Sequence, residues 1–161
     1  MRKIIMSYEG MTEKQFRDII PIGEIQIYEG NCWAATLSML LRCHGFDISQ
    51  GYVTSLFHEW RFDGVTARQM AQLVNFFNNN WLNRNGWTMN TADGCDEILS
   101  FIDQFGPIQV FIDGHFILVL GYDSVDESVT YFDPWDGSVN TVSYPQFSRL
   151  GLRETVYMYK E

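Results

Sequence analysis

The chain has few of the groups that would indicate a redox, metal or zinc-stabilised protein. It contains three cysteines, Cys32, Cys43 and Cys95, and no two of them form a C-x-x-C pair. An odd number of cysteines without such a pair argues against both a disulfide framework and a structural zinc site. We therefore expect neither a metal nor a cofactor.

Positive charge and long apolar runs are also scarce. Eleven Lys and Arg residues are scattered among 20 Asp and Glu, which gives a formal net charge of −9. Phosphate contacts need clustered basic side chains, so we exclude nucleic acid as a partner. No stretch reaches the roughly 20 apolar residues of a membrane helix, and Ile4-Ile5-Met6 is too short for the core of a signal peptide. We expect no membrane association and a protein that is cytoplasmic as synthesised.

Hydrophobic and aromatic side chains are abundant, at 46% and 16% of the 161 residues. This composition is typical of a packed globule, and the length suits one domain. The asparagine-rich stretch 78–86 is the most loop-like part of the chain and separates helical from strand-like patterns. We expect a single domain, 1–161, with a helical lobe at about 1–85 and a sheet lobe at about 86–161.

Capping residues and helical periodicity predict five helices before Gly106, which begin after Thr12, Asn31, Ser49, Thr66 and Asp93. The second, residues 32–44, is apolar on nearly every side, so we expect it in the centre of the domain. After Pro107, segments rich in β-branched and aromatic residues predict an antiparallel sheet. Its expected strands are 108–112, 115–121, 128–133, 139–143 and 155–159. Helices followed by strands indicate the α+β class.

Cys32 is the candidate nucleophile because it lies in the first turn of the predicted central helix. There the helix dipole and the backbone N–H groups favour a thiolate, the form of cysteine that attacks carbonyls. Cys43 lies near the opposite end of the same helix, where a thiolate is disfavoured. Cys95 also begins a predicted helix and is the second candidate, although no histidine or oxyanion donor is placed beside it by the sequence.

Gln26 is the candidate partner for the oxygen of an attacked carbonyl. It precedes Cys32 by six residues, and its amide together with the Cys32 N–H would form an oxyanion hole. The alternation Ile25-Gln26-Ile27 also fits a strand with an exposed glutamine, and on that alternation alone the exposed position is the better interpretation.

The general base is chosen from three histidines. His44 lies twelve residues after Cys32 on one helix, about 18 Å away at ~1.5 Å per residue, which is too far. His58 is expected on the exposed side of a surface helix. His115 opens a strand directly after Asp113-Gly114, and strand ends at a cleft are common positions for a base.

Asp133 is the acid expected to orient His115. The strand from His115 turns near 123–128 and returns to Asp133, so an antiparallel pairing places His115 near residues 133–136. Asp136 and Asp113 are the rival acids. The segment from Asp133 through Pro134 to Gly137 also fits a simple turn.

The ordered set of these residues resembles the papain-like cysteine peptidases. It consists of Gln26, then Cys32-Trp33-Ala34, then His115 at a strand start, then Asp133 with Trp135 two positions later, and it spans roughly residues 24–137. Papain has asparagine where this chain has Asp133, and Cys-Gly-Ser where this chain has 29–31. The aspartate and the small size look more like bacterial relatives, such as double-glycine leader peptidases and small effector proteases.

This resemblance implies a papain-like fold, with Cys32 on the central helix of one lobe and His115 and Asp133 on the sheet of the other. It implies a cysteine endopeptidase acting on a protein or peptide, with cleavage after small residues such as Gly-Gly. We also expect Trp33, Trp135 and Gly114, which lie close to these residues in sequence, to contact substrate.

The biological setting and the acceptor are left open by the sequence. A bacterial effector or toxin, delivered by a signal-independent route and opposed by an inhibitor or immunity protein, is the expectation we favour over a housekeeping processing enzyme. An amidase, deamidase or transglutaminase-like toxin would use the same nucleophile. A catalytically silent binding module is the third alternative.

Overall fold

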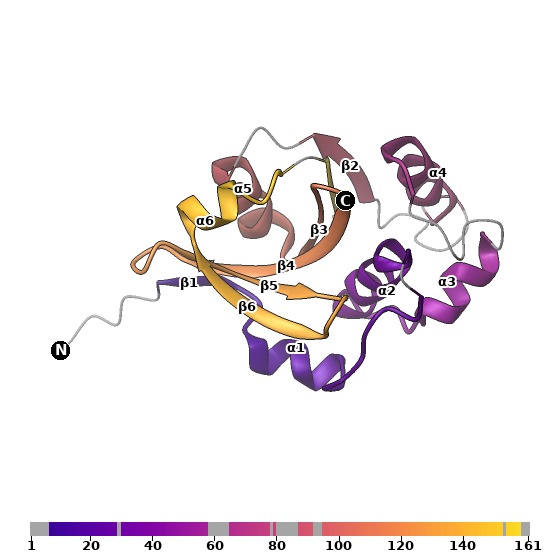
Figure 1. Ribbon diagram of the computed structural model, residues 1–161, viewed down its shortest axis with the longest axis horizontal. Helices are drawn as coiled ribbons and strands as arrows, with labels where there is room; N and C mark the ends of the chain where they lie inside the picture. The colour runs from indigo at the N-terminus through magenta and orange to yellow at the C-terminus, as the bar shows by residue number, and fades with distance from the viewer. Residues whose placement is uncertain are drawn as a thin grey trace.

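The computed structural model describes residues 7–28, 30–57, 65–77, 79, 87–91, 95–152 and 154–158 (Figure 1). Helices surround one antiparallel sheet, and the elements follow in this order: β1 (Tyr8–Gly10), α1 (Glu13–Ile19), α2 (Cys32–Cys43), α3 (Gln50–Leu56), α4 (Ala67–Phe77), β2 (Trp87–Thr91), α5 (Cys95–Phe105), β3 (Ile108–Ile112), β4 (His115–Asp123), β5 (Ser128–Asp133), β6 (Ser138–Ser143), α6 (Tyr144–Ser148) and β7 (Glu154–Met158). Among these residues, no helix is both long and apolar enough to cross a membrane.

The sheet has seven strands in the order β2-β7-β3-β4-β5-β6, with β1 paired to β4 outside this path. Every pairing is antiparallel. The longest strand, β4, pairs with β3 through its first half, with β1 through its second half and with β5 on its other edge. It therefore forms the middle of the sheet.

The two faces of β4 bury different helices. Phe116, Leu118 and Leu120 belong to the core that contains α2, whereas Ile117 and Val119 belong to the core that contains α5. This division follows from the period of two residues in a strand, which sends successive side chains to opposite faces. Figure 1 shows α2 between the sheet on one side and α3 and α4 on the other. Such a position requires the nearly all-apolar helix that the sequence contains, and every residue from Cys32 to Leu41 is buried.

A buried glutamine connects the sheet to the first turn of α2. Gln109 on β3 is fully buried, and its Nε2 donates to the Trp33 carbonyl at 3.1 Å and to the Thr36 hydroxyl at 2.6 Å. The Thr36 hydroxyl in turn donates to the Cys32 carbonyl at 2.7 Å. These hydrogen bonds offset the cost of burying the amide nitrogen of Gln109. Gln109 thus fixes the start of α2 relative to the sheet.

The α+β class and the predicted central helix are confirmed. Thr12 forms a capping box at the start of α1, Ser49 caps α3, and Thr66 exchanges hydrogen bonds with Gln69 at the start of α4. Strands β3 and β5 match their predicted bounds. The sequence did not predict β1, β2 or α6. The expected lobe boundary at 85/86 and the expected cap at Asp93 lie outside the described residues.

We predict that Gln109→Met lowers the free energy of unfolding by about 1–3 kcal/mol. Methionine has a similar length but cannot donate to the Trp33 carbonyl or to Thr36, so both lose a buried partner. Urea denaturation measures the change. The matched control is Gln104→Met, which removes an exposed glutamine from α5 and should change stability by less than about 0.5 kcal/mol. Equal effects of the two substitutions would contradict the structural role of Gln109.

Candidate active site

Cys32 is the first residue of α2, and its side chain is 8% exposed. The first N–H groups of a helix have no acceptor within the helix, and they carry its positive dipole end. The Asn31 side chain makes no capping bond to them. The sulfur is therefore largely buried and lies at the positive end of the helix dipole, an environment that favours a thiolate.

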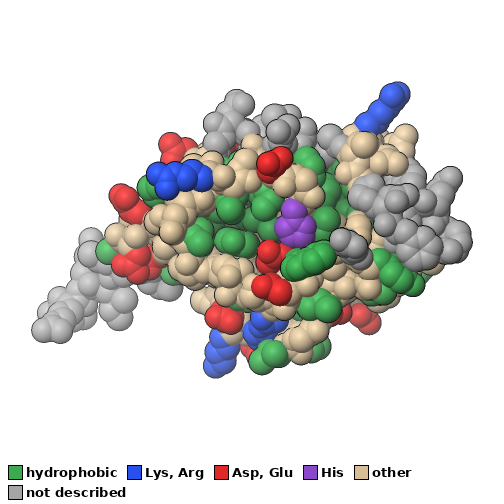
Figure 2. Space-filling view, viewed as in Figure 1, with side chains coloured by type: hydrophobic (Ala, Val, Ile, Leu, Met, Phe, Trp, Pro, Cys, Tyr) green, Lys and Arg blue, Asp and Glu red, His purple; other side chains and the backbone are tan. Residues whose placement is uncertain are grey.

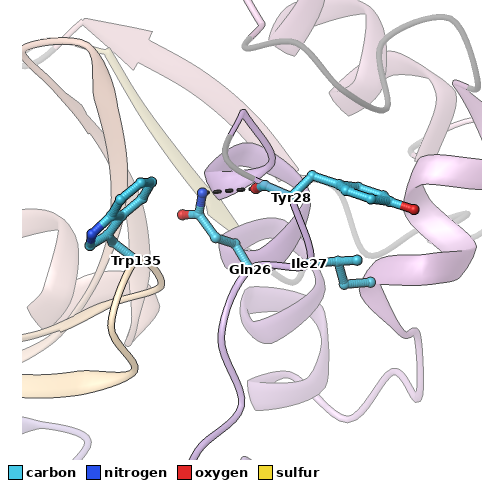
Figure 3. Close-up of a pocket in the computed structure, with 4 residues that line it drawn as sticks. All are labelled: Gln26, Ile27, Tyr28 and Trp135. Carbon is cyan, nitrogen blue, oxygen red and sulfur yellow. Dashed lines mark hydrogen bonds between the residues drawn. The ribbon is translucent and has the colours of Figure 1, made fainter.

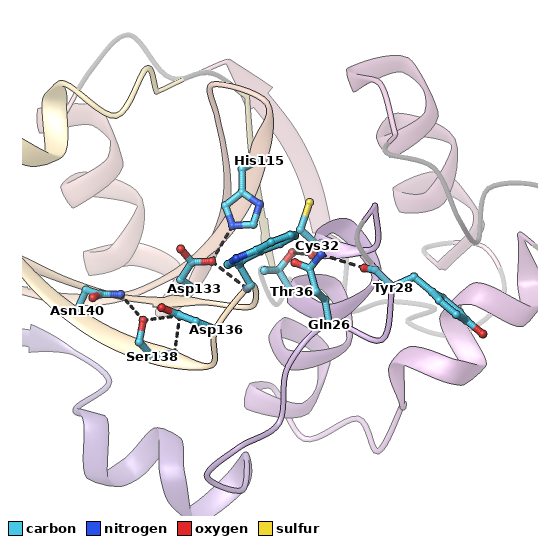
Figure 4. Close-up of polar contacts among 10 residues, drawn as sticks. Gln26, Tyr28, Cys32, Thr36, His115, Asp133, Asp136, Ser138 and Asn140 are labelled. Carbon is cyan, nitrogen blue, oxygen red and sulfur yellow. Dashed lines mark hydrogen bonds and ion pairs between the residues drawn. The ribbon is translucent and has the colours of Figure 1, made fainter.

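His115 is the first residue of β4, directly after the turn Asp113-Gly114. Gly114 has a φ of 73°, a backbone conformation that other residues rarely adopt, and this allows β3 to reverse into β4 within two residues. The histidine thus occupies the first position of β4, opposite Ile112 at the end of β3. Figure 4 shows the Cys32 side chain and the His115 ring next to each other, from α2 and β4.

Asp133, the last residue of β5, forms the third part of this arrangement. Its Oδ1 lies 2.7 Å from Nε2 of His115 and also accepts the Trp135 backbone N–H at 3.0 Å. The other ring nitrogen of His115 is then left for the Cys32 sulfur, which lies near enough to the imidazole to raise its pKa. The three side chains come from three separate elements, with the imidazole next to both the sulfur and the carboxylate.

The electrostatic environment keeps His115 protonated at neutral pH. Burial lowers the pKa of the imidazole, but the hydrogen bond to Asp133 and the electrostatic influence of Cys32 and Asp133 outweigh burial. Together they raise the pKa of His115 from 6.5 to about 9. An imidazolium beside a sulfur stabilises the thiolate by charge and by hydrogen bonding, which is the activated state of a cysteine nucleophile.

The rival acids and nucleophiles lie in less suitable surroundings. Asp136 accepts hydrogen bonds from the Ser138 hydroxyl at 2.6 Å and the Ser138 N–H at 3.0 Å, which lower its pKa, and the structure gives it no hydrogen bond to His115. Burial raises the pKa of the Cys43 thiol to about 12 despite the nearby Arg42. Burial also raises the pKa of Cys95. Both are uncharged thiols at neutral pH.

The other two histidines do not alter this choice. His44 is the C-cap residue of α2, at the opposite end of that helix from Cys32. His58 lies outside the described residues.

Figure 2 shows a histidine side chain at the surface of the molecule with acidic and hydrophobic side chains around it.

Gln26 lies beside the turn after β5. It is 6% exposed, its backbone N–H donates to the Pro134 carbonyl at 2.8 Å, and its Nε2 donates to the Tyr28 carbonyl at 2.9 Å. The interpretation of Gln26 as an exposed strand residue is wrong, because Gln26 is buried while Ile25 and Ile27 are 45% and 53% exposed.

A pocket of about 350 Å³ adjoins Gln26 and is lined by Gln26, Ile27, Tyr28 and Trp135 (Figure 3). Ile27 and Tyr28 were not predicted as site residues. The signal that identifies these two residues is the burial of segment 25–27, in which the polar residue lies inside and the apolar residues lie outside. This signal is visible only in the structure.

The residues expected to contact substrate have different positions. Trp135 is 56% exposed and lines the pocket. Gly114 is exposed in the turn before His115. Trp33 has no exposed surface and packs in the α2 core, so its expected contact with substrate needs correction: it supports the helix rather than binding a ligand. Among the described residues, no three metal-ligating side chains gather at one point.

Comparisons with known proteins bear on the fold and the family. The model of the Peptidase_C39 like family matches residues 13–155. A search of curated proteins finds no match. Among solved structures, the peptidase domain of Streptococcus ComA, a bi-functional ABC transporter involved in a quorum sensing pathway, is 16% identical. It has a TM-score of 0.64, and the match covers 85% of this chain and 96% of that one.

Two further structures are similar. A double glycine motif protease from an AMS/PCAT transporter, solved in complex with the leader peptide, is 14% identical with a TM-score of 0.66, covering 89% of this chain and 97% of that one. UfSP from C. elegans is 11% identical with a TM-score of 0.56, covering 82% of this chain and 30% of that one. These likenesses concern the fold, whereas the family match spans most of the sequence. The chain therefore belongs to the Peptidase_C39 like family and is a cysteine peptidase with the papain-like fold.

Proposed function

We propose that the chain is an endopeptidase in which Cys32, His115 and Asp133 act as a catalytic triad. The observation that carries the proposal is the position of a helix-borne sulfur beside an imidazole that is held at 2.7 Å by a carboxylate. A nucleophile next to a base, with the base oriented by a third group, is the arrangement that activates cysteine for acyl transfer.

In the proposed reaction, the Cys32 thiolate attacks the carbonyl carbon of the scissile peptide bond. The carbonyl oxygen becomes an oxyanion that accepts hydrogen bonds from the Cys32 N–H and the Gln26 amide. The His115 imidazolium gives its proton to the departing amine, which leaves an acyl-enzyme. Water then attacks the thioester with His115 as base, and the Cys32 thiolate is released. Asp133 holds the ring so that one nitrogen always faces the sulfur.

We propose, further, that the peptide bonds cut follow small residues such as Gly-Gly. This proposal is supported by the similarity of the fold to a double glycine motif protease bound to a leader peptide. The effector or toxin role, the inhibitor or immunity partner and the route of delivery stay predictions from the sequence. So does the alternative of an amidase or deamidase, which would use the same triad on a side-chain amide.

The proposed activity is tested by exposing a proteome digest to the wild type and to Cys32→Ala. We expect new peptide termini with the wild type and none with the variant, because the variant lacks the sulfur that forms the acyl-enzyme. Mass spectrometry reads both outcomes at once, since cleavage gives two fragments and deamidation gives a gain of one dalton. A gain of one dalton without fragments would replace the endopeptidase by a deamidase. Unchanged peptides, with Cys32 still reduced, would refute both.

We predict that peptidase activity falls on the alkaline side with an apparent pKa near 9. His115 is protonated below this value, and the imidazolium that pairs with the thiolate is lost as the pH rises through it. Asp133→Asn removes a negative charge that raises the pKa of His115, so the alkaline limb should move to lower pH. Rate measurements of kcat between pH 5 and 10 test this.

The control for this prediction is Asp136→Asn. Asp136 bonds to Ser138 rather than to His115, so its replacement should move the alkaline limb much less. An alkaline limb that Asp133→Asn leaves in place would show that Asp133 does not set the charge of the base.

A further inference from the structure

Exposed apolar side chains gather on both sides of the proposed oxyanion residue. Ile27, Tyr28 and Trp135 are 53%, 45% and 56% exposed, and together with Gln26 they line one pocket. We call these three residues the apolar strip. Figure 3 shows Trp135 on one side of Gln26, and Ile27 and Tyr28 on the other. Exposed apolar side chains that lie together on a surface mark interaction sites.

Hydrogen bonds fix the backbone beneath the strip. Gln50 is 5% exposed, and its side chain spans the segment: Nε2 donates to the Ile25 carbonyl at 2.7 Å, and Oε1 accepts the Ile27 N–H at 3.2 Å. The Gln26 N–H donates to the Pro134 carbonyl, which ties the segment to the turn that carries Trp135. The apolar side chains are therefore presented outward by a held backbone. A surface that is ordered before binding loses little entropy when a ligand arrives.

The same hydrogen bonds restrict how a peptide can bind. The Ile25 carbonyl, the Gln26 N–H and the Ile27 N–H already have partners within the protein. Addition of a substrate strand needs backbone groups of this kind as its pairing edge. A peptide that lies on the strip therefore cannot pair with these three groups, and apolar side chains in the peptide would match Ile27, Tyr28 and Trp135.

The stereochemistry of the proposed reaction assigns the strip to one side of the cut. The attacked carbon carries the Cys32 sulfur, the oxyanion, the acyl part of the substrate and the departing nitrogen. The oxyanion faces Gln26 and the nitrogen faces His115, which protonates it. Trp135 lies on the His115 side because its N–H bonds to the carboxylate that holds the imidazole. The chain that continues from the nitrogen therefore meets Trp135, and the pocket that Trp135 lines extends past Gln26 to Ile27 and Tyr28.

We propose that the apolar strip binds the first residues after the scissile bond and selects substrates with large apolar side chains there. This inference rests on the proposed endopeptidase activity and adds a specificity that small residues before the cut would not supply. Trp135, Ile27 and Tyr28 are then specificity-determining residues, and Gln50 is a positioning residue that acts through the backbone of the strip.

The test uses a proteome-derived peptide library and the full chain, with the position of every cut read by mass spectrometry. We expect Leu, Ile, Val, Met or Phe to be enriched within the first three positions after the cut. Ile27→Ser and Trp135→Ala should each reduce kcat/KM roughly tenfold for peptides with such residues, relative to peptides with serine there, because one apolar contact is lost. Val125→Ser is the matched control: Val125 is 70% exposed in the turn between β4 and β5, and its loss should leave the preference unchanged.

The outcomes separate this inference from the proposed function. Cuts without apolar enrichment after the scissile bond, or with enrichment only before it, would overturn the role of the strip and leave the peptidase intact. Equal loss of preference in Val125→Ser and Ile27→Ser would also overturn it, because the effect would not belong to the strip. If the wild type makes no cuts while Cys32 stays reduced, the peptidase proposal fails, and this inference fails with it.

Discussion

The burial of α2 against one face of β4 is the constraint on which the site depends. A helix that is buried from Cys32 to Leu41 has no freedom to rotate or slide, since each shift would leave apolar side chains without neighbours. Gln109 on β3 also holds the first turn of the helix in place, through hydrogen bonds to the Trp33 carbonyl and the Thr36 hydroxyl. The pairing of β3 with β4 in turn fixes the position of His115 relative to α2. The sulfur and the imidazole are thus placed by packing that involves residues far from either of them.

Two opposing effects set the pKa of His115: burial lowers it, and the neighbouring side chains raise it. A partly buried imidazole is uncharged at neutral pH when it has no acidic partner, because desolvation disfavours its cation. Here Asp133 and Cys32 together exceed that effect and raise the pKa of His115 to about 9. The carboxylate is held in turn by the Trp135 N–H, so its orientation does not depend on the histidine alone. The contact that orders the loop after β5 therefore also holds the carboxylate that raises the pKa of His115.

The sequence was informative where one physical signal dominated. The apolar helix around Cys32, the capping residues Thr12 and Ser49 and the hairpin that leads from His115 to Asp133 follow from periodicity and turn chemistry, and the structure has each of them. Local patterns failed where tertiary contacts override them. Strands β1 and β2 are short and gain their partners, β4 and β7, from distant parts of the chain. Alternation at 25–27 predicted the opposite burial, because Gln50 and Pro134 bind this backbone from elsewhere. Trp33 follows Cys32 but packs inward, since helical geometry turns it toward the core.

The central proposal is that Cys32 is a nucleophile activated by the His115 imidazolium. The most direct measurement is the rate at which iodoacetamide modifies each cysteine at pH 6, followed by mass spectrometry of the three cysteine-containing peptides. We predict that Cys32 reacts at least tenfold faster than Cys43 and Cys95, both of which have raised pKa values, and that His115→Ala removes this selectivity. Equal modification of all three cysteines, or a Cys32 rate that His115→Ala leaves unchanged, would contradict the account.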